Sequence, residues 1–147
     1  MFCTSIACLI YSRGLSLGSP LIRAADRWGR WSHCGVVLQA EAVVVEARAF
    51  HGVVRTPLEA FERRVTHCEQ VQIPVPDCAA GAAWLEQQLG KGYDYGGVAG
   101  NLFRADWHSP RRHHCANLVE AYLHACGLRR WRVPLWRLSP NLSWMVM

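Results

Sequence analysis

The chain has 147 residues, of which 51% are hydrophobic and 18% are charged, and its formal net charge is +5. This length and composition exclude a disordered or low-complexity chain, and they indicate one domain with one hydrophobic core over residues 1–147. The chain has neither an apolar run of the roughly 20 residues that span a bilayer nor a positively charged leader, so we expect a cytoplasmic protein without a membrane span.

The amino-terminal part of the chain predicts one strand and one helix. Ile6–Tyr11 is a short apolar run and predicts a strand. Pro20–Trp28 has helical spacing of its apolar residues, with Ser19 at the N-cap position and Gly29 directly after its last residue. This pattern predicts a helix that ends before Gly29.

The next predicted elements form a β-hairpin with a third strand. His33–Leu38 and Ala42–Ala47 are β-branched runs a few residues apart, which predicts two paired strands. The Gln39-Ala40 dipeptide contains neither Gly nor Asn, so we expect a connection longer than a two-residue turn, and the register stays open. Gly52–Arg55 predicts a third strand, and Pro57–Arg64 predicts a short helix.

The remaining elements are one strand and two helices. Glu69–Val75 alternates polar and apolar residues, as a half-buried strand does. Asp77–Leu89 predicts a helix with Asp77 as its N-cap and Gly90 at its end. Cys115–Cys126 has the clearest helical periodicity, and Gly127 ends it. Strands in one block with helices on either side define the α+β fold class.

All of the net positive charge lies in the last third of the chain. Residues 1–103 carry nine basic and nine acidic side chains, whereas residues 104–147 carry seven arginines against two acidic residues. Four of the seven tryptophans lie in the same segment, and arginine with tryptophan is a combination that binds nucleic acid. No basic cluster exceeds two residues, so we favour a substrate-binding or solvated face over a nucleic-acid interface.

Cys115 is the strongest candidate for a nucleophile. The seven cysteines match no disulfide framework, so reduced thiols are expected. A helix amino terminus lowers the pKa of a thiol through the helix dipole and free N–H groups, and the thiolate is the reactive form. Cys115 begins the best-defined helix, whereas Cys126 lies at its far end. Cys78 follows Asp77 at the start of another helix and is the alternative, although the adjacent carboxylate opposes a thiolate there.

His33 and Glu46 are the candidates for the base and for the group that orients it. A cysteine nucleophile needs a histidine to accept its proton and a third group to hold that histidine. His33 begins a predicted strand, and Glu46 is the lone carboxylate of the next one. A buried carboxylate is costly unless paired, and an imidazole on the neighbouring strand would pair with it. The alternatives are a structural histidine at position 33 and a solvent-facing carboxylate at position 46.

Two further clusters carry atoms that bind metal ions or phosphate. His108, His113, His114 and Cys115 offer metal ligands, but three adjacent residues cannot all face one ion from regular structure. The glycine-rich segment 96–100 lacks the Lys-Ser/Thr pair that binds phosphate. We therefore expect neither a metal nor a cofactor.

Four short motifs occur in an order that resembles a known enzyme family. They are Ser32-His33-x-Gly35-Val36-Val37, Val45-Glu46-Ala47, Gly92-Tyr93-Asp94 and Cys115-x-x-Leu118-Val119. Together they resemble the permuted branch of the NlpC-type papain-like cysteine peptidases and amidases, whose familiar members are YiiX-like. In that branch the histidine strand precedes the cysteine helix, which is also the order here. The resemblance runs from about Ile6 to Leu128.

The resemblance implies a fold and a role for three of the matched residues. The implied fold is a circularly permuted papain-like one, in which a central antiparallel sheet packs against helices. Cys115 corresponds to the nucleophile of a thiol protease, His33 to the general base and then acid, and Glu46 to the group that orients the imidazole. The implied reaction is attack of the thiolate on an amide or ester carbonyl, which gives an acyl-enzyme.

The substrate-binding residues also follow from the resemblance. In related enzymes a tyrosine before the cysteine helix helps to form the substrate pocket, and Tyr93 and Tyr95 occupy that place. Tyr11, Tyr93 and Tyr95 are the candidate substrate-binding residues, and they are also the candidates for the second oxyanion donor, beside the backbone N–H at the helix start. The family often has Cys-Ser-Glu where this chain has Cys115-Ala116-Asn117, a difference that bears on substrate specificity.

The function that we expect is hydrolysis of an amide bond through a thioacyl-enzyme. The substrate would be a small amide, a peptide or a peptidoglycan-type compound. An acyltransferase or thioesterase acting on lipid or ester substrates is the first alternative, because related permuted folds act on lipids. A binding domain that keeps the fold without catalysis is the second.

Overall fold

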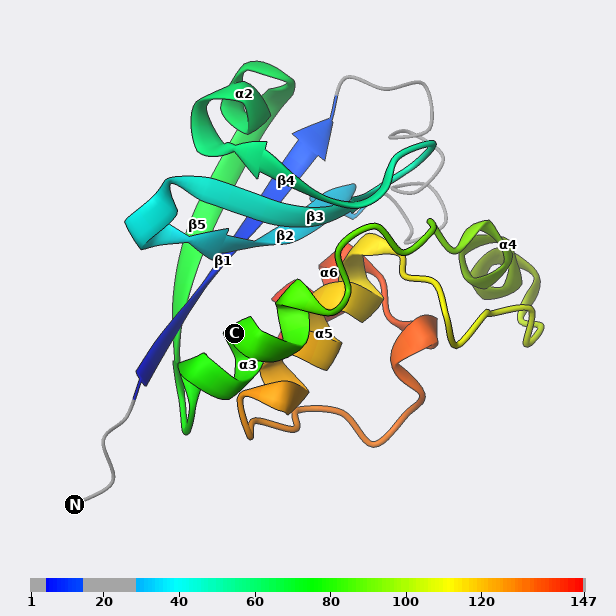
Figure 1. Ribbon diagram of the computed structural model, residues 1–147. Coiled ribbons are helices and arrows are strands. Elements are labelled where there is room, and N and C mark those ends of the chain that lie inside the picture. The colour runs from blue at the N-terminus through cyan, green and yellow to red at the C-terminus, as the bar shows by residue number, and fades with distance from the viewer. Residues whose placement is uncertain (1–4, 15–28, 147) are drawn as a thin grey trace.

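Five strands form an antiparallel sheet within the residues that the computed structural model describes, 5–14 and 29–146 (Figure 1). Their order across the sheet is β4-β3-β2-β1-β5. The strands are β1 (Ser5–Gly14), β2 (His33–Leu38), β3 (Val43–Arg48), β4 (Gly52–Pro57) and β5 (Val65–Val75). Every predicted strand is present, and the α+β class with a central antiparallel sheet is confirmed. β5 begins before the predicted Glu69 because its pairing with β1 continues to Gly14 and Val65.

Helices follow the strands in the second half of the chain. The described helices are α2 (Leu58–Arg63), α3 (Cys78–Glu86), α4 (Tyr95–Phe103), α5 (Cys115–Ala125) and α6 (Pro140–Trp144), with 3-10 turns η1 (Gln39–Glu41) and η2 (Leu135–Arg137). The predictions of α2, α3 and α5 are confirmed, and the predicted helix Pro20–Trp28 lies outside the described residues. None of the helices in the described ranges combines the length and apolar character that crossing a membrane requires.

α4 forms where the sequence indicated only a glycine-rich turn. Asp94 caps this helix, because its Oδ1 accepts a hydrogen bond from the Gly97 N–H at 3.0 Å. The chain then folds back against the helix so closely that a Cβ at Gly96 would lie 2.1 Å from the Trp107 carbonyl oxygen. Glycine has low helix propensity, so the sequence pattern hides a helix that this tight return stabilises.

The β2–β3 connection has the length that the sequence predicted. η1 joins the two strands, and Ala42 closes the turn in the left-handed region at φ 51°. The resulting register pairs Val36 with Val45 and Val37 with Val44. This register determines which β3 side chains face His33.

Helices cover both faces of the sheet. α3, α5 and α6 pack on one face, and α2 packs on the other (Figure 1). Because successive side chains of a strand point to opposite faces, the buried residues form one core on each face of the sheet. Leu9 and Val36 belong to the core beneath α5, whereas Ile10 and Val37 belong to a smaller core around Phe61. Each such side chain contributes roughly 1.5–3 kcal/mol on burial, so both layers stabilise the sheet.

α5 is anchored along its whole length, which holds its amino end against the sheet. Leu118, Val119 and Leu123 are fully buried. α3 crosses α5 so closely that a Cβ at Gly81 would lie 2.1 Å from the Cys126 Sγ. The first residue of α5 therefore has a well-defined position next to β2.

Candidate active site

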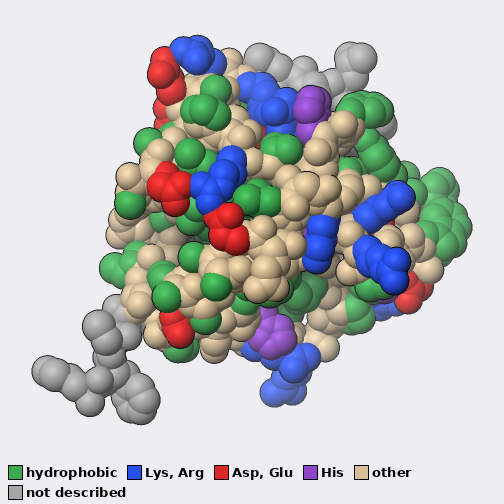
Figure 2. Space-filling model, viewed as in Figure 1, with side chains coloured by type: hydrophobic (Ala, Val, Ile, Leu, Met, Phe, Trp, Pro, Cys, Tyr) green, Lys and Arg blue, Asp and Glu red, His purple; other side chains and the backbone are tan. Residues whose placement is uncertain are grey.

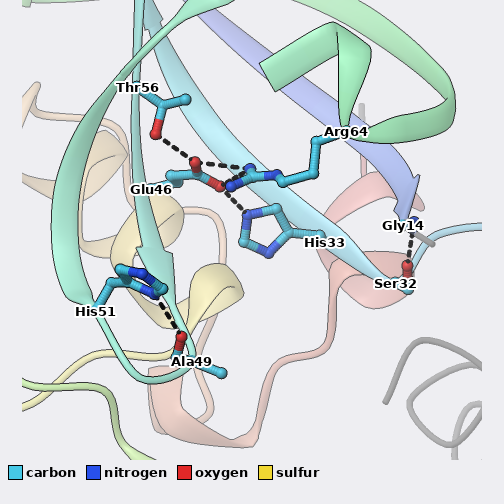
Figure 3. A network of polar contacts seen from close by, with 8 residues as sticks. All are labelled: Gly14, Ser32, His33, Glu46, Ala49, His51, Thr56 and Arg64. Carbon is cyan, nitrogen blue, oxygen red and sulfur yellow. Dashed lines mark hydrogen bonds and ion pairs between the residues drawn. The ribbon is translucent and has the colours of Figure 1, made fainter. Parts of the chain in front are cut away.

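The β2–β3 hairpin brings His33 and Glu46 together on one face of the sheet. Gly35 lies beside Glu46, and a Cβ at Gly35 would be 3.4 Å from the Glu46 Cβ. Because glycine has no side chain there, the His33 ring reaches along the hairpin to the carboxylate. The His33 Nε2–H donates a hydrogen bond to Glu46 Oε2 at 2.5 Å (Figure 3). The structure thus pairs the two residues that the sequence placed on neighbouring strands.

Glu46 is fully buried and has three hydrogen-bonding partners. The Thr56 hydroxyl donates to Oε1 at 2.6 Å, and the Arg64 Nη2 lies 2.7 Å from both carboxylate oxygens (Figure 3). β3 lies between β2 and β4, so the alternative of a solvent-facing carboxylate is wrong. Burial acts to raise the pKa of Glu46, but the hydrogen bonds from His33, Arg64 and Thr56 outweigh it and lower the pKa to about 2.

Arg64 and Thr56 are members of this network that the sequence did not reveal. Arg64 follows α2 and its guanidinium lies over the Phe61 ring, 5.2 Å from the ring centroid. Phe61 in turn stacks on the His33 ring, with 6.0 Å between the centroids. α2 therefore holds both Arg64 and His33 in position. The only sequence signal for Arg64 was its place at the end of the predicted short helix.

Glu46→Gln is expected to lower the free energy of unfolding near neutral pH. The carboxyl pKa falls from its ordinary 4.5 to about 2 on folding, which corresponds to stabilisation on the order of 3 kcal/mol. This contribution is present above the unfolded pKa of 4.5 and is lost as the pH falls toward 2. Urea unfolding should therefore show a large difference from the wild type near neutral pH and a smaller one below about pH 3.

Glu59→Gln is the matched control for this measurement. Glu59 pairs with Arg63 on the surface, where the two side chains are 79% and 69% exposed. Exposed pairs of this kind contribute little, so we expect a change below about 0.5 kcal/mol at either pH. Equal destabilisation by Glu46→Gln at both pH values would contradict the assignment of an ionised, paired Glu46.

Cys115 lies at the first position of α5, next to the His33 end of β2. It is buried, with 4% of its surface exposed. Cys34 has the largest effect on the pKa of the Cys115 thiol, and together with His114 and His33 it outweighs burial and holds that pKa well below its ordinary value. The helix amino terminus acts in the same direction.

Cys115 and Glu46 both affect the ionisation of His33. Burial favours the neutral ring, but the hydrogen bonds with Cys115 and Glu46 outweigh it and raise the pKa of His33 to about 10. Nε2 is engaged by Glu46, which leaves Nδ1 as the ring nitrogen that serves the thiol. The favoured state near neutral pH is therefore a thiolate beside an imidazolium, which can attack an electrophilic carbon and return a proton to the leaving group.

The two histidines that precede Cys115 have structural roles. His114 Nδ1 accepts a hydrogen bond from the Asn117 N–H at 3.4 Å, and its Nε2 donates to the Trp136 carbonyl at 3.0 Å. This pattern requires the neutral ring and makes His114 the N-cap of α5. His113 is buried between Asn117 and Gln88, and burial lowers its pKa. Neither histidine has a free ring nitrogen to act as a base.

Cys78 lies far from the His33–Glu46 pair. It begins α3 beside Tyr122 and Cys126, at the carboxyl end of α5. The length of α5, roughly 15 Å at 1.5 Å per residue, separates that end from Cys115. Of the two candidate nucleophiles, Cys115 is the one whose thiol pKa is lowered by His33.

Two of the three predicted substrate-binding tyrosines lie beside the site. Tyr93 forms a bridge with His113, in which Asp94 N–H donates to the His113 carbonyl at 3.0 Å. Burial and then the charge of Cys115 raise the pKa of Tyr93, so its hydroxyl is electrostatically coupled to the sulfur. The Tyr95 ring lies 4.9 Å from that of Tyr93, between centroids, and is partly exposed.

Tyr11 does not reach the site, which corrects its assignment as a substrate-binding residue. It is fully buried, and its hydroxyl lies 2.7 Å from Ser143 Oγ in α6. The physical reason is strand alternation: Tyr11 and Leu9 point from β1 into the core between the sheet and the helices. A side chain held in this way offers no surface to a substrate.

The fold and the site together define an α+β protein with a buried Cys-His-Glu cluster at the junction of a helix start and a β-hairpin. No protein-family model matches the sequence, and no curated protein matches it. Among solved structures, the crystal structure of the metalloprotein YiiX from Escherichia coli O157:H7 matches with a TM-score of 0.62 and 24% identity. The match covers 85% of this chain and 68% of that one, and it shows that the two share a mixed fold of strands and helices.

The described residues do not fit a metal ion such as the name of that neighbour implies. Residues 5–14 and 29–146 contain no group of three or more His, Cys, Asp or Glu side chains arranged to hold one. His113 and His114, two of the candidate ligands, use their ring nitrogens in the hydrogen bonds described above.

Proposed function

We propose that this chain is a cysteine hydrolase of the permuted NlpC-type papain-like class, and that it cleaves amide bonds. The observation that carries the proposal is the position of His33, which hydrogen-bonds to the buried Glu46 and whose pKa is raised by Cys115 as well as by Glu46. The order of these residues, histidine strand first and cysteine helix last, supports the permuted class. The substrate class is a small amide, a peptide or a peptidoglycan-type compound.

The reaction begins with attack of the Cys115 thiolate on the carbonyl carbon. The His33 imidazolium then gives its proton to the leaving amine, and a thioacyl-enzyme remains. The neutral imidazole next takes a proton from water, whose oxygen attacks the thioester and releases the acid. Glu46 keeps its hydrogen bond to His33 Nε2 throughout, which fixes the ring and stabilises its charged form.

The oxyanion would form at the amino end of α5. The backbone N–H groups at a helix start are unpaired donors, and the helix dipole favours negative charge there. The Cys115 N–H is the first donor of the proposed oxyanion hole. Tyr93 is the candidate for a second donor, because the charge of Cys115 is among the causes that raise the pKa of its hydroxyl. Loss of one such donor lowers the rate by roughly 100- to 1,000-fold in other enzymes.

Thioacyl trapping tests the proposed function. The protein is incubated with activated acyl esters and with peptide amides, quenched in acid, and mapped by peptide mass spectrometry. We expect an acid-stable acyl group on Cys115, and none on Cys78. Turnover with no adduct on Cys115, or equal acylation of several cysteines, would overturn the assignment and favour a binding domain of the same fold.

An acyltransferase or thioesterase with a lipid substrate is the second candidate. The observation that favours it is an exposed apolar surface on and beside α4, where hydrophobic side chains gather with Lys and Arg nearby (Figure 2). Leu102, Phe103 and Trp107 are 61%, 66% and 55% exposed. Faster acylation of Cys115 by long-chain esters than by peptide amides, or transfer of the acyl group to an amine or alcohol, would favour this candidate.

A further inference from the structure

α4 presents its large apolar residues to the solvent and its smallest residues to the rest of the protein. Tyr95, Leu102 and Phe103 are exposed, and their spacing of i, i+7 and i+8 places them on one face of the helix. The opposite face carries Gly97 and Gly100, which are buried. A helix that packs on a protein core normally turns its apolar face inward, so this reversed arrangement indicates a surface for a partner.

Two ring contacts extend the exposed face at the two ends of α4. The Phe50 ring, in the turn between β3 and β4, lies 5.9 Å from the Tyr95 ring between centroids, and the Phe50 N–H donates to the Tyr95 hydroxyl at 2.6 Å. Phe50 is 92% exposed. At the other end, the Phe103 ring lies 5.7 Å from that of Trp107, which is also exposed. These residues form the α4 patch: Phe50, Tyr95, Leu102, Phe103 and Trp107.

Positive charge borders the α4 patch. Segment 91–112, all of which the structure describes, carries four basic side chains against two acidic ones. The exposed basic side chains are its three arginines, Arg104, Arg111 and Arg112. Asp94 is buried, and Asp106 pairs with His108, so little negative charge opposes them. Figure 2 shows hydrophobic side chains gathered over α4 with Lys and Arg beside them.

We propose that the α4 patch binds the surface of a bilayer that contains anionic phospholipids. Trp, Tyr and Phe side chains are favoured at the level of the lipid headgroups, and Arg side chains are attracted to the negative surface. A second copy of this chain is less suited, because a two-fold contact through the patch would bring two positive borders together. This inference goes beyond the proposed function, since binding needs no catalysis.

The α4 patch also adjoins the candidate active site. The Tyr95 ring lies 4.9 Å from that of Tyr93, between centroids. Tyr93 in turn packs against the core that contains Cys115. A bilayer bound at the α4 patch would therefore lie next to the start of α5.

The test is co-sedimentation of the full chain with phosphatidylcholine vesicles, with and without phosphatidylserine, in the absence of substrate. We expect binding to the anionic vesicles that weakens as salt is added, and little binding to the neutral ones. Phe103→Ala removes an exposed ring that the bilayer would bury, so the Kd for anionic vesicles should rise about tenfold. Arg104→Ala removes one positive charge and should raise the Kd about fivefold.

Ile6→Ala and Arg63→Ala are the matched controls. Ile6 is an exposed apolar residue near the start of β1, which lies at the opposite end of the molecule from α4 (Figure 1). Arg63 is exposed on α2, and its replacement changes the net charge as Arg104→Ala does. Neither control should change the Kd. All four positions are exposed, so we expect the variants to stay folded, which thermal melting checks.

Trp107 gives a direct readout of insertion into the bilayer. Brominated acyl chains quench the fluorescence of a tryptophan that enters the apolar layer, so we expect quenching in the wild type. Trp107→Phe keeps an aromatic ring and should still bind, but the quenching should be lost. Quenching that persists in Trp107→Phe would place another tryptophan in the bilayer and contradict the assignment of the α4 patch.

Three results of the co-sedimentation would overturn the proposal. They are the absence of binding to anionic vesicles, equal binding to neutral ones, and wild-type binding by Phe103→Ala and Arg104→Ala. Self-association that Phe103→Ala abolishes, without vesicle binding, would assign the patch to a contact between two copies of this chain instead. Because binding is measured without substrate, its failure leaves the proposed hydrolase intact, and failure to acylate Cys115 leaves the membrane proposal intact.

Discussion

Cys115→Ala is expected to lower the turnover of an amide substrate by at least about 1,000-fold, because it removes the thiolate that we propose as the nucleophile. Nothing else in the described site replaces it: His113 and His114 hold structural hydrogen bonds, and Tyr93 keeps its proton. The variant should stay folded, since alanine is a good helix former and the change removes one buried atom. Measurement of kcat/KM beside thermal melting separates the two effects.

Cys78→Ala is the matched control for this variant. Cys78 also begins a helix, but its neighbours are Tyr122 and Cys126 rather than a histidine. We expect this variant to retain most of the activity. Full activity in Cys115→Ala, or loss of activity confined to Cys78→Ala, would assign the nucleophile to Cys78 in α3. The order of the catalytic residues would then no longer support the permuted class.

His33→Ala is expected to lower turnover by roughly 100- to 10,000-fold, the range that a positioned general acid–base contributes. Its pH profile should change as well. In the wild type, His33 must be protonated to release the leaving group, so the rate should fall as the pH rises through the His33 pKa of about 10. In His33→Ala this fall of the rate at alkaline pH should vanish. The rise of the rate at acid pH, which follows ionisation of the Cys115 thiol, should move to higher pH because the thiol loses its cationic partner.

His124→Ala is the control for the loss of a histidine as such. His124 lies in the last turn of α5 and is exposed. Its replacement should leave both limbs of the pH profile in place. An alkaline limb that persists in His33→Ala would show that another group supplies the proton, and His33 would then have a structural role.

The fold could largely be predicted because its signals lie within short stretches of sequence. Each signal lies within about a dozen consecutive residues. The signals are the β-branched runs of β2 and β3, the alternation of β5 and the periodicity of α5. α4 could not be predicted, because its glycines are required by a tight return of the chain near Trp107 that no local pattern reveals.

The pairing of His33 with Glu46 could be predicted from the sequence, whereas the other partners of these side chains could not. His33, Glu46 and Cys115 are unusual for their local settings, a polar side chain in an apolar strand or a cysteine at a helix start. Arg64 reaches Glu46 only through the position of α2 over the sheet, and Cys34 shares the buried core with Cys115 only because α5 packs on β2. Contacts that depend on such long-range geometry cannot be predicted from a single sequence.

The central claim is that His33 and Cys115 form an ion pair, and the titration of the His33 ring by NMR tests it most directly. With histidine-labelled protein and the His33→Gln variant for assignment, the ring should remain protonated from neutral pH up to about 10. In Cys115→Ala its pKa should fall toward the ordinary 6.5, because the negative partner is gone. A His33 that titrates near 6.5 in the wild type, with no response to Cys115→Ala, would contradict the ion pair.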